Sequence, residues 1–160
     1  MYNNKTLLIT GGTGSLGKAL TKEIFLRHPS IGKIMVFSRD EQKHFQMRQE
    51  FPIEKFPNLE FVIGDVRDYQ SLKAVFNKVD YVIHAAAMKH VHLSENNPEE
   101  CIKTNVGGAQ NVINAAQDSS VSNVVALSTD KACAPVNLYG ATKLTSDKLF
   151  IAANNNKHSK

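Results

Sequence analysis

The stretch Thr10-Gly11-Gly12-Thr13-Gly14-Ser15-Leu16-Gly17 follows an apolar run at residues 5–10 and precedes a helical pattern at residues 15–27. The run predicts a buried strand, and the spacing of apolar residues after it predicts an amphipathic helix. Glycines at this junction permit a tight turn and bring the backbone close to a pyrophosphate, which the amides of the helix start then face. The plain alternative is a flexible turn, but the position between strand and helix favours a dinucleotide site. We predict cofactor contacts from Gly11, Thr13, Gly14, Ser15, Leu16 and Gly17.

Strand and helix patterns alternate along the rest of the chain. Short apolar runs at residues 34–37, 59–63, 81–84 and 123–127 predict strands, and residues 40–50, 68–76, 98–117 and 138–153 predict helices. Near-continuous apolar strands separated by helices are typical of a parallel sheet that is covered on both faces. We therefore predict an α/β fold, namely a Rossmann-type doubly wound parallel sheet with strand order 3-2-1-4-5 and helices on both faces.

The length of 160 residues suits one domain. We expect an NAD(P)-binding domain at residues 1–153 and a polar tail at residues 154–160, where a C-terminal substrate lobe absent from this chain would follow. The net charge of +4 comes from scattered basic residues, so we expect no nucleic-acid partner. Two cysteines without a CxxC spacing argue against a disulfide framework or a zinc site and suit the cytoplasm. No run resembles an export or membrane segment, and we expect a homo-oligomer.

The second strand ends in Ser38-Arg39-Asp40, about twenty residues after the glycines, where a Rossmann domain meets the adenosine ribose. An acid there binds the ribose 2′-hydroxyl, whereas a basic residue accommodates a 2′-phosphate, so Ser38 and Arg39 favour NADP over NAD. Asp40 is alternatively the N-cap of the next helix. Asp65 and Val66, after the third strand, are placed to meet the adenine, although an aspartate at a helix start is an equally ordinary interpretation.

The fourth strand is followed by Ala85, Ala86 and Ala87, whose small side chains let a flat cofactor lie against the backbone. Lys89 and His90 come next in a loop above the sheet. We predict that Lys89 contacts both cofactor and substrate and that His90 contacts substrate. The alternative for both is an exposed polar loop residue.

Two polar residues in apolar surroundings have structural interpretations. His84 closes an apolar strand, and since no second ligand has suitable spacing, a hydrogen-bonded structural histidine is favoured over a metal ligand. Asn105 lies on a predicted helix and is either structural or part of a water-holding relay near the cofactor. We predict no metal site.

The densest chemistry lies between Ser128 and Lys143. Tyr139 and Lys143, four residues apart, share a helix face, and the ammonium favours the phenolate that a tyrosine base requires. Ser128 or Thr129 offers a hydroxyl that orients a substrate, while Asp130 and Lys131 supply an acid and a base. The alternative for Asp130 and Lys131 is a weak surface ion pair.

The chain resembles the extended short-chain dehydrogenases/reductases over nearly its whole length. More narrowly, it is similar to the soluble nucleotide-sugar 4,6-dehydratases that invert C5 of UDP-N-acetylglucosamine in pseudaminic acid synthesis, and hence in flagellin glycosylation. Five stretches carry this resemblance: residues 11–15, 37–41, 64–68, 84–91 and 127–143. Met88 and His92 stand where leucine and proline are expected, next to the substrate.

The resemblance implies an internal redox cycle. Tyr139, helped by Lys143, takes the proton of the sugar 4-hydroxyl as hydride passes from C4 to NADP. Lys131 then removes the C5 hydrogen, and Asp130 protonates the departing 6-hydroxyl. NADPH returns hydride to C6, and reprotonation from the other face inverts C5. Related retaining enzymes hold glutamate where this chain has Lys131, so the lysine indicates inversion; the cycle requires Lys131 neutral and Asp130 protonated at the relevant steps.

Two other functions remain open. A nucleotide-sugar 4-epimerase or reductase of the same superfamily needs Tyr139 and Lys143 but not the pair Asp130 and Lys131. A non-catalytic dinucleotide-binding module is possible because fold alone does not fix function. For residues 1–160 alone we expect nucleotide binding with little or no turnover.

Overall fold

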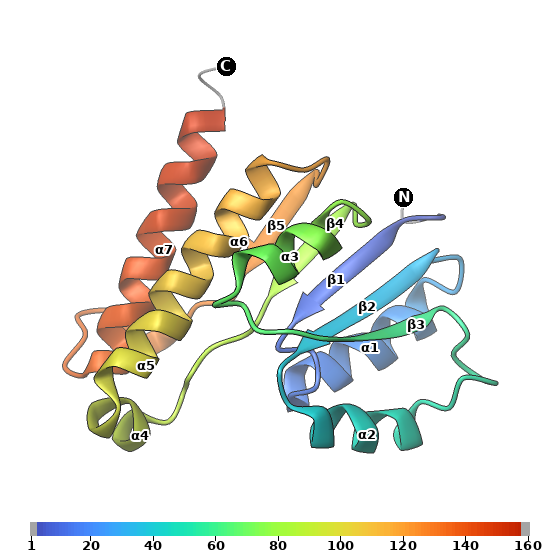
Figure 1. The fold of residues 1–160 in the computed structure, drawn as a ribbon, viewed down its shortest axis with the longest axis horizontal. Helices are drawn as coiled ribbons and strands as arrows, with labels where there is room; N and C mark the ends of the chain where they lie inside the picture. Colours follow the sequence, from blue (N-terminus) through green and yellow to red (C-terminus); the bar gives the residue numbers. More distant parts are fainter. Residues whose placement is uncertain (1–2, 158–160) are drawn as a thin grey trace.

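The computed structural model describes residues 3–157 and contains a five-stranded parallel sheet (Figure 1). The strand order is β3-β2-β1-β4-β5, which confirms the predicted topology. Each neighbouring pair is parallel, so the carboxyl ends of all five strands meet at one edge of the sheet. The strands are β1 (Thr6–Thr10), β2 (Lys33–Ser38), β3 (Leu59–Ile63), β4 (Tyr81–His84) and β5 (Asn123–Ala126).

Helices cover both faces of the sheet because successive strand residues point to opposite sides. Leu7 and Ile9 of β1 belong to one buried cluster, together with residues of α1 (Ser15–Arg27) and α2 (Glu41–Glu50). Leu8, between them, belongs to the other cluster, with residues of α3 (Tyr69–Phe76) and α6 (Gly108–Gln117). Figure 1 shows α1 behind the strands and α3 and α6 in front of them. The doubly wound arrangement thus rests on two apolar cores.

The segment after β4 differs from the prediction. Residues 91–96 form a short helix, α4 (Val91–Asn96), which the sequence did not reveal because its side chains are mostly polar. The predicted helix at residues 98–117 consists of three parts, namely α5 (Pro98–Ile102), the π turn η1 (Lys103–Gly107) and α6. A π turn is wider than an α turn and often occurs at functional sites.

The last helix, α7 (Leu138–Lys157), is longer than predicted. The expected polar tail began at residue 154, but residues 154–157 continue the helix, since no glycine or proline interrupts its backbone hydrogen bonds. Residues 158–160 of that tail lie outside the described residues. A single 3-10 turn, η2 (Asp130–Ala132), lies between β5 and α7. No helix within residues 3–157 is both long and apolar enough to cross a membrane.

Candidate active site at the carboxyl ends of the strands

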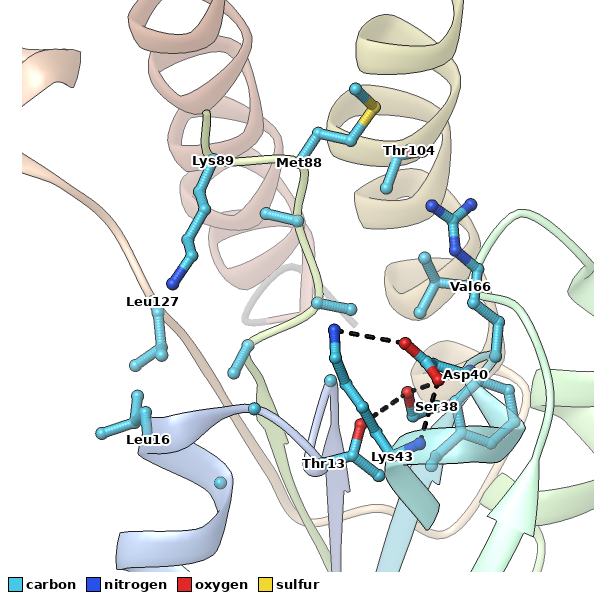
Figure 2. Close-up of a pocket in the computed structure, with 18 of the residues that line it drawn as sticks. Thr13, Leu16, Ser38, Asp40, Lys43, Val66, Met88, Lys89, Thr104 and Leu127 are labelled. Carbon is cyan, nitrogen blue, oxygen red and sulfur yellow. Dashed lines mark hydrogen bonds and ion pairs between the residues drawn. The ribbon is translucent and has the colours of Figure 1, made fainter. Parts of the chain in front are cut away.

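A cavity of about 820 Å³ lies along the carboxyl edge of the sheet (Figure 2). Residues from the ends of all five strands and from the start of α1, α2 and α7 line it. The lining includes Gly11, Thr13, Gly14, Ser15, Leu16, Gly17, Ser38, Arg39, Asp65, Val66, Ala85, Ala86, Ala87, Lys89, His90, Ser128, Tyr139 and Lys143. Most of the predicted site residues therefore meet in one place.

The glycine turn is packed too tightly for other residues at two positions. Gly11 has φ +66°, and a Cβ there would lie 2.8 Å from the Cα of Ala86. A Cβ at Gly17 would lie 2.1 Å from the carbonyl oxygen of Gly12. The turn therefore presses against the strand ends, and α1 begins at the cavity with its first amides toward it.

The end of β2 is fixed by hydrogen bonds. Thr13 donates its hydroxyl to Ser38 Oγ at 2.9 Å, as Figure 2 shows. The carboxylate of Asp40 accepts a hydrogen bond from the backbone N–H of Lys43 at 3.0 Å. The Nζ of Lys43 lies 3.2 Å from Asp40 Oδ2. Asp40 is thus the N-cap of α2, which confirms that interpretation, and Arg39 and Lys43 place two cations at this end of the cavity.

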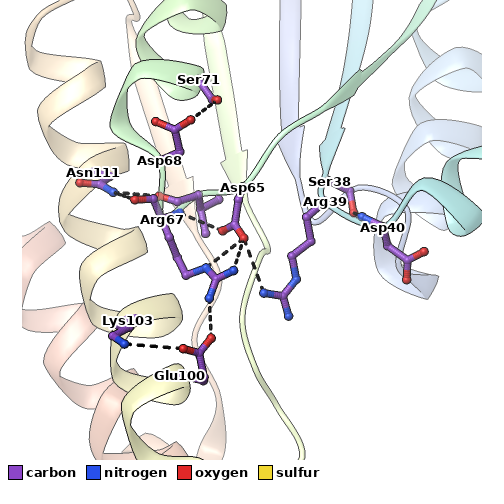
Figure 3. A network of polar contacts seen from close by, with 11 residues as sticks. Ser38, Arg39, Asp40, Asp65, Arg67, Asp68, Ser71, Glu100, Lys103 and Asn111 are labelled. Atoms are coloured by element: carbon purple, nitrogen blue, oxygen red, sulfur yellow. Dashed lines mark hydrogen bonds and ion pairs between the residues drawn. The ribbon is translucent and has the colours of Figure 1, made fainter.

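Asp65 is held by arginines from two directions (Figure 3). Arg67 donates to its carboxylate at 2.6 Å, and Arg39 Nη1 lies 3.6 Å from the same oxygen. Partial burial alone would raise the pKa of Asp65, but hydrogen bonds from Arg67 and the charges of both arginines lower it on balance. Asp65 lines the cavity as an ionised group that also anchors Arg39.

His84 lies buried beneath the cavity. Its Nδ1 is 2.8 Å from the hydroxyl of Thr10, which confirms the predicted hydrogen-bonded structural role. Burial first, and then the charge of Lys143, lower the pKa of His84 to about 3, so the imidazole is neutral. Among residues 3–157 no group of three or more histidine, cysteine, aspartate or glutamate side chains is arranged to hold a metal ion.

Tyr139 and Lys143 form a buried pair on the first turns of α7. Their exposed fractions are 9% and 5%. Lys143 donates its Nζ to the carbonyl oxygen of Leu127, at the end of β5, at 2.5 Å. Burial lowers the pKa of Lys143, while the nearby carboxylate of Asp147 opposes that shift. A phenol and an ammonium thus face the cavity from a helix that the sheet holds in place.

Thr129, Asp130 and Lys131 do not line the cavity. Asp130 and Lys131 form an ion pair at 3.4 Å, and their side chains are 86% and 48% exposed. The hydrogen bond from Thr129 first, and then the charge of Lys131, lower the pKa of Asp130. In this structure Asp130 and Lys131 therefore form the surface ion pair that the sequence offered as the alternative. They lie next to α7, since a Cβ at Gly140 would meet the carbonyl oxygen of Lys131 at 2.1 Å.

Asn105 is 2% exposed and lies outside the cavity lining. Its amide accepts the N–H of Met88 at 2.8 Å and donates to the carbonyl of Met88 at 3.0 Å. It also donates to Thr142 Oγ1 at 3.0 Å. The residue therefore ties the loop after β4 to α7, which corresponds to the structural interpretation, and it positions Met88 rather than lining the cavity itself.

The cavity also contains residues that the sequence did not indicate as site residues. Lys43 stands three residues after Asp40, and a helix start at Asp40 would have placed it near the second strand's end. Thr104 and Leu127 come to the cavity only through tertiary packing. Figure 2 shows Lys89 extending toward Leu127. The further lining residues are Lys18, Phe37, Asp40, Gln46, Gly64 and Met88.

Three known proteins illustrate what the chain is similar to. It is 59% identical over 155 residues to a UDP-N-acetylglucosamine 4,6-dehydratase (inverting) of Campylobacter jejuni, a match that covers 97% of this chain and 45% of that protein. The crystal structure of Pen from Bacillus thuringiensis has a TM-score of 0.94 and 41% identity, over 99% of this chain and 49% of that one. A dTDP-glucose 4,6-dehydratase, DesIV of Streptomyces venezuelae, solved with NAD bound, has a TM-score of 0.76 and 28% identity, over 88% of this chain and 49% of that one.

The chain spans about half the length of the relatives that it matches. The family model described as polysaccharide biosynthesis protein matches residues 7–160, which is nearly the whole chain. The glycine turn, the sheet except for Thr6 at the start of β1, and the buried tyrosine–lysine pair lie within that match. The chain belongs to the polysaccharide biosynthesis protein family.

Proposed function

We propose that the protein is an NADP-dependent nucleotide-sugar 4,6-dehydratase that converts UDP-N-acetylglucosamine to a 4-keto-6-deoxy sugar with inversion at C5. One observation carries the proposal: the glycine turn and the buried pair of Tyr139 and Lys143 face the same cavity. The similarity to an inverting UDP-N-acetylglucosamine dehydratase supports the substrate. We further propose that the protein acts in pseudaminic acid synthesis for flagellin glycosylation, in the cytoplasm and as a homo-oligomer.

The cavity suits a nicotinamide dinucleotide. Gly11, Gly14 and Gly17 line the cavity without side chains, so the backbone there is open to a pyrophosphate. When bound, the dinucleotide supplies a hydride acceptor that later returns the hydride. Arg39 and Lys43 lie where a 2′-phosphate would add negative charge, which favours NADP over NAD.

Cofactor choice is tested by calorimetric titration with NADP and NAD. We expect NADP to bind more tightly, and Arg39→Gln to weaken NADP binding roughly 10- to 100-fold with little effect on NAD, since a hydrogen bond to a charged group contributes about 1.5–3 kcal/mol. Arg27→Gln, on the exposed end of α1, is the matched control. Equal affinities of the unaltered protein for both dinucleotides would refute the preference.

Tyr139 takes the proton of the sugar 4-hydroxyl in this proposal. Lys143 supplies a positive charge on the same helix face, which stabilises the phenolate. Asp130 and Lys131 carry the elimination of the 6-hydroxyl, as acid and base, and Thr129 orients the sugar. Because these three residues stand outside the lining, the proposal requires η2 to turn toward the cavity when substrate binds.

The decisive experiment incubates the full-length protein with UDP-N-acetylglucosamine in deuterated water. Removal and return of the C5 hydrogen places deuterium at C5 of a 4-keto-6-deoxy product. A second function, nucleotide-sugar 4-epimerisation, is favoured by the exposure of Asp130 and Lys131, since it needs only Tyr139 and Lys143. A 4-epimer without deuterium at C5 would indicate the epimerase, and nucleotide binding without turnover would indicate a non-catalytic module. We propose that residues 1–160 alone bind nucleotide with little turnover.

A further inference from the structure

Asp147 lies one helical turn after Lys143 on α7 and contacts the end of β5. Ser128, which lines the cavity, donates its hydroxyl to Asp147 Oδ2 at 2.5 Å. The preceding residue, Leu127, accepts the Nζ of Lys143 through its carbonyl oxygen. Two consecutive strand-end residues are thus joined to two consecutive turns of the same helix face. The carboxylate of Asp147 completes this double connection.

A buried ammonium needs a compensating charge. Lys143 is 5% exposed, and burial disfavours its charged form. His84 on β4 faces it as a neutral imidazole, because its pKa of about 3 leaves it unprotonated near neutrality. Tyr139 shares the helix face of Lys143 and is itself 9% exposed. Among the groups that act electrostatically on Lys143 in the described residues, Asp147 supplies the negative charge.

We infer that Asp147 is a positioning residue of the site: its carboxylate fixes the hydroxyl of Ser128 at the cavity wall and places a negative charge one helical turn from Lys143, whose Nζ is held by the neighbouring Leu127. The inference rests on the proposed pairing of Lys143 with Tyr139, and it adds the carboxylate that opposes the effect of burial on this lysine. Ser128 is thereby oriented by α7 rather than by the strand from which it comes.

The inference is tested by NMR titration of the protein carrying isotope-labelled lysine side chains, with Lys143 assigned through Lys143→Arg. In Asp147→Asn the neutral amide retains an acceptor for Ser128 but loses the charge. We expect the titration midpoint of Lys143 to fall by roughly one pH unit. Asp147→Glu should restore the unaltered midpoint, and Asp147→Ser is a second neutral variant if Asp147→Asn folds poorly.

Two controls separate charge from hydrogen bonding. Ser128→Ala removes the hydroxyl and leaves the carboxylate, so the midpoint should stay. Asp118→Asn removes a carboxylate that binds Tyr69 instead, and should also leave it unchanged. An unchanged midpoint in both neutral variants of Asp147, or an equal shift in Ser128→Ala, would overturn the inference. The titration needs no substrate, so absence of dehydratase turnover would refute the proposed function separately.

Discussion

Two pairs of ionisable side chains, Tyr139 with Lys143 and Asp130 with Lys131, lie about eight residues apart in the sequence. The first pair is buried, whereas the second is exposed to solvent. The first pair is 9% and 5% exposed, whereas the side chains of the second are 86% and 48% exposed. α7 and the end of β5 hold the first pair in position. The second pair lies on a single 3-10 turn, where Asp130 accepts hydrogen bonds from Thr129 and Lys131.

The difference separates what is preorganised from what must move. Burial makes a charge on Lys143 costly. It also holds the side chain in one orientation, because Nζ donates to the carbonyl oxygen of Leu127 at the sheet edge. Hydrogen bonding from Thr129 and the charge of Lys131 lower the pKa of Asp130 and keep its carboxylate ionised, which is the wrong protonation state for an acid. In the proposed reaction, proton removal by the first pair therefore needs little rearrangement, while elimination by the second needs a change of environment.

The largest expected effect is on catalysis. Tyr139→Phe in the full-length protein should lower the rate of product formation by roughly 10²- to 10⁴-fold, since it removes the proposed general base. Asp130→Asn should also abolish product, but reduced nicotinamide should still form, because oxidation at C4 precedes elimination. Steady-state and single-turnover absorbance measurements distinguish the two. Tyr69→Phe, at a surface tyrosine, is the control, and full activity of Tyr139→Phe would contradict the assignment.

The next effect is on stability, and it tests the burial of His84 beside the first pair. His84, beside Lys143, has a pKa lowered from 6.5 to about 3, so unfolding takes up a proton in this range. Its contribution to stability is complete above pH 6.5 and is lost as the pH falls toward about 3, by roughly 5 kcal/mol in all. Urea unfolding across this range should show a flatter pH dependence in His84→Asn than in the unaltered protein. Parallel profiles would show that His84 is not the titrating group.

A smaller effect concerns the contact that joins the two pairs. Gly140→Ala would place a Cβ 2.1 Å from the carbonyl oxygen of Lys131, and backbone cannot move aside cheaply. We expect the free energy of unfolding to fall by about 1–3 kcal/mol. Gly107→Ala is the matched control, since a Cβ there meets nothing within 4 Å and alanine favours a helix. Equal denaturation midpoints for the two variants would contradict the contact.

The smallest effect is expected at the exposed pair itself. Lys131→Met should leave the denaturation midpoint unchanged within error, because an exposed ion pair contributes little to folding. The same variant should lose deuterium incorporation at C5 in the full-length protein. A clear loss of stability would show that Lys131 is a structural group, and it would remove the contrast between the two pairs.

The sequence predicted the sheet, its order and most of the cavity because these follow from local signals. Apolar runs marked the strands, and the glycine turn marked the position of the cavity through its place between strand and helix. Asp40 was recognisable as an N-cap from residue type alone.

Features that depend on tertiary contacts were not predictable in this way. The role inferred for Asp147 depends on its hydrogen bond with Ser128, nineteen residues earlier, and no sequence periodicity connects the two residues. The exposure of Asp130 follows from how η2 leaves β5, and a motif does not encode that. The π turn at Lys103–Gly107 has no composition that distinguishes it from an ordinary helix.

That π turn has a consequence for how this region can change in evolution. A π turn holds one residue more than an α turn, and successive helical residues are rotated by about 100°. Deleting one residue between Lys103 and Gly107 would therefore rotate Asn105 away from Met88 and Thr142, or else rotate α6 away from the sheet. Both faces can be kept only if the extra residue is kept. The extra residue sets the rotation of α6 relative to α5, so the length of this helix is as constrained as its amino acids.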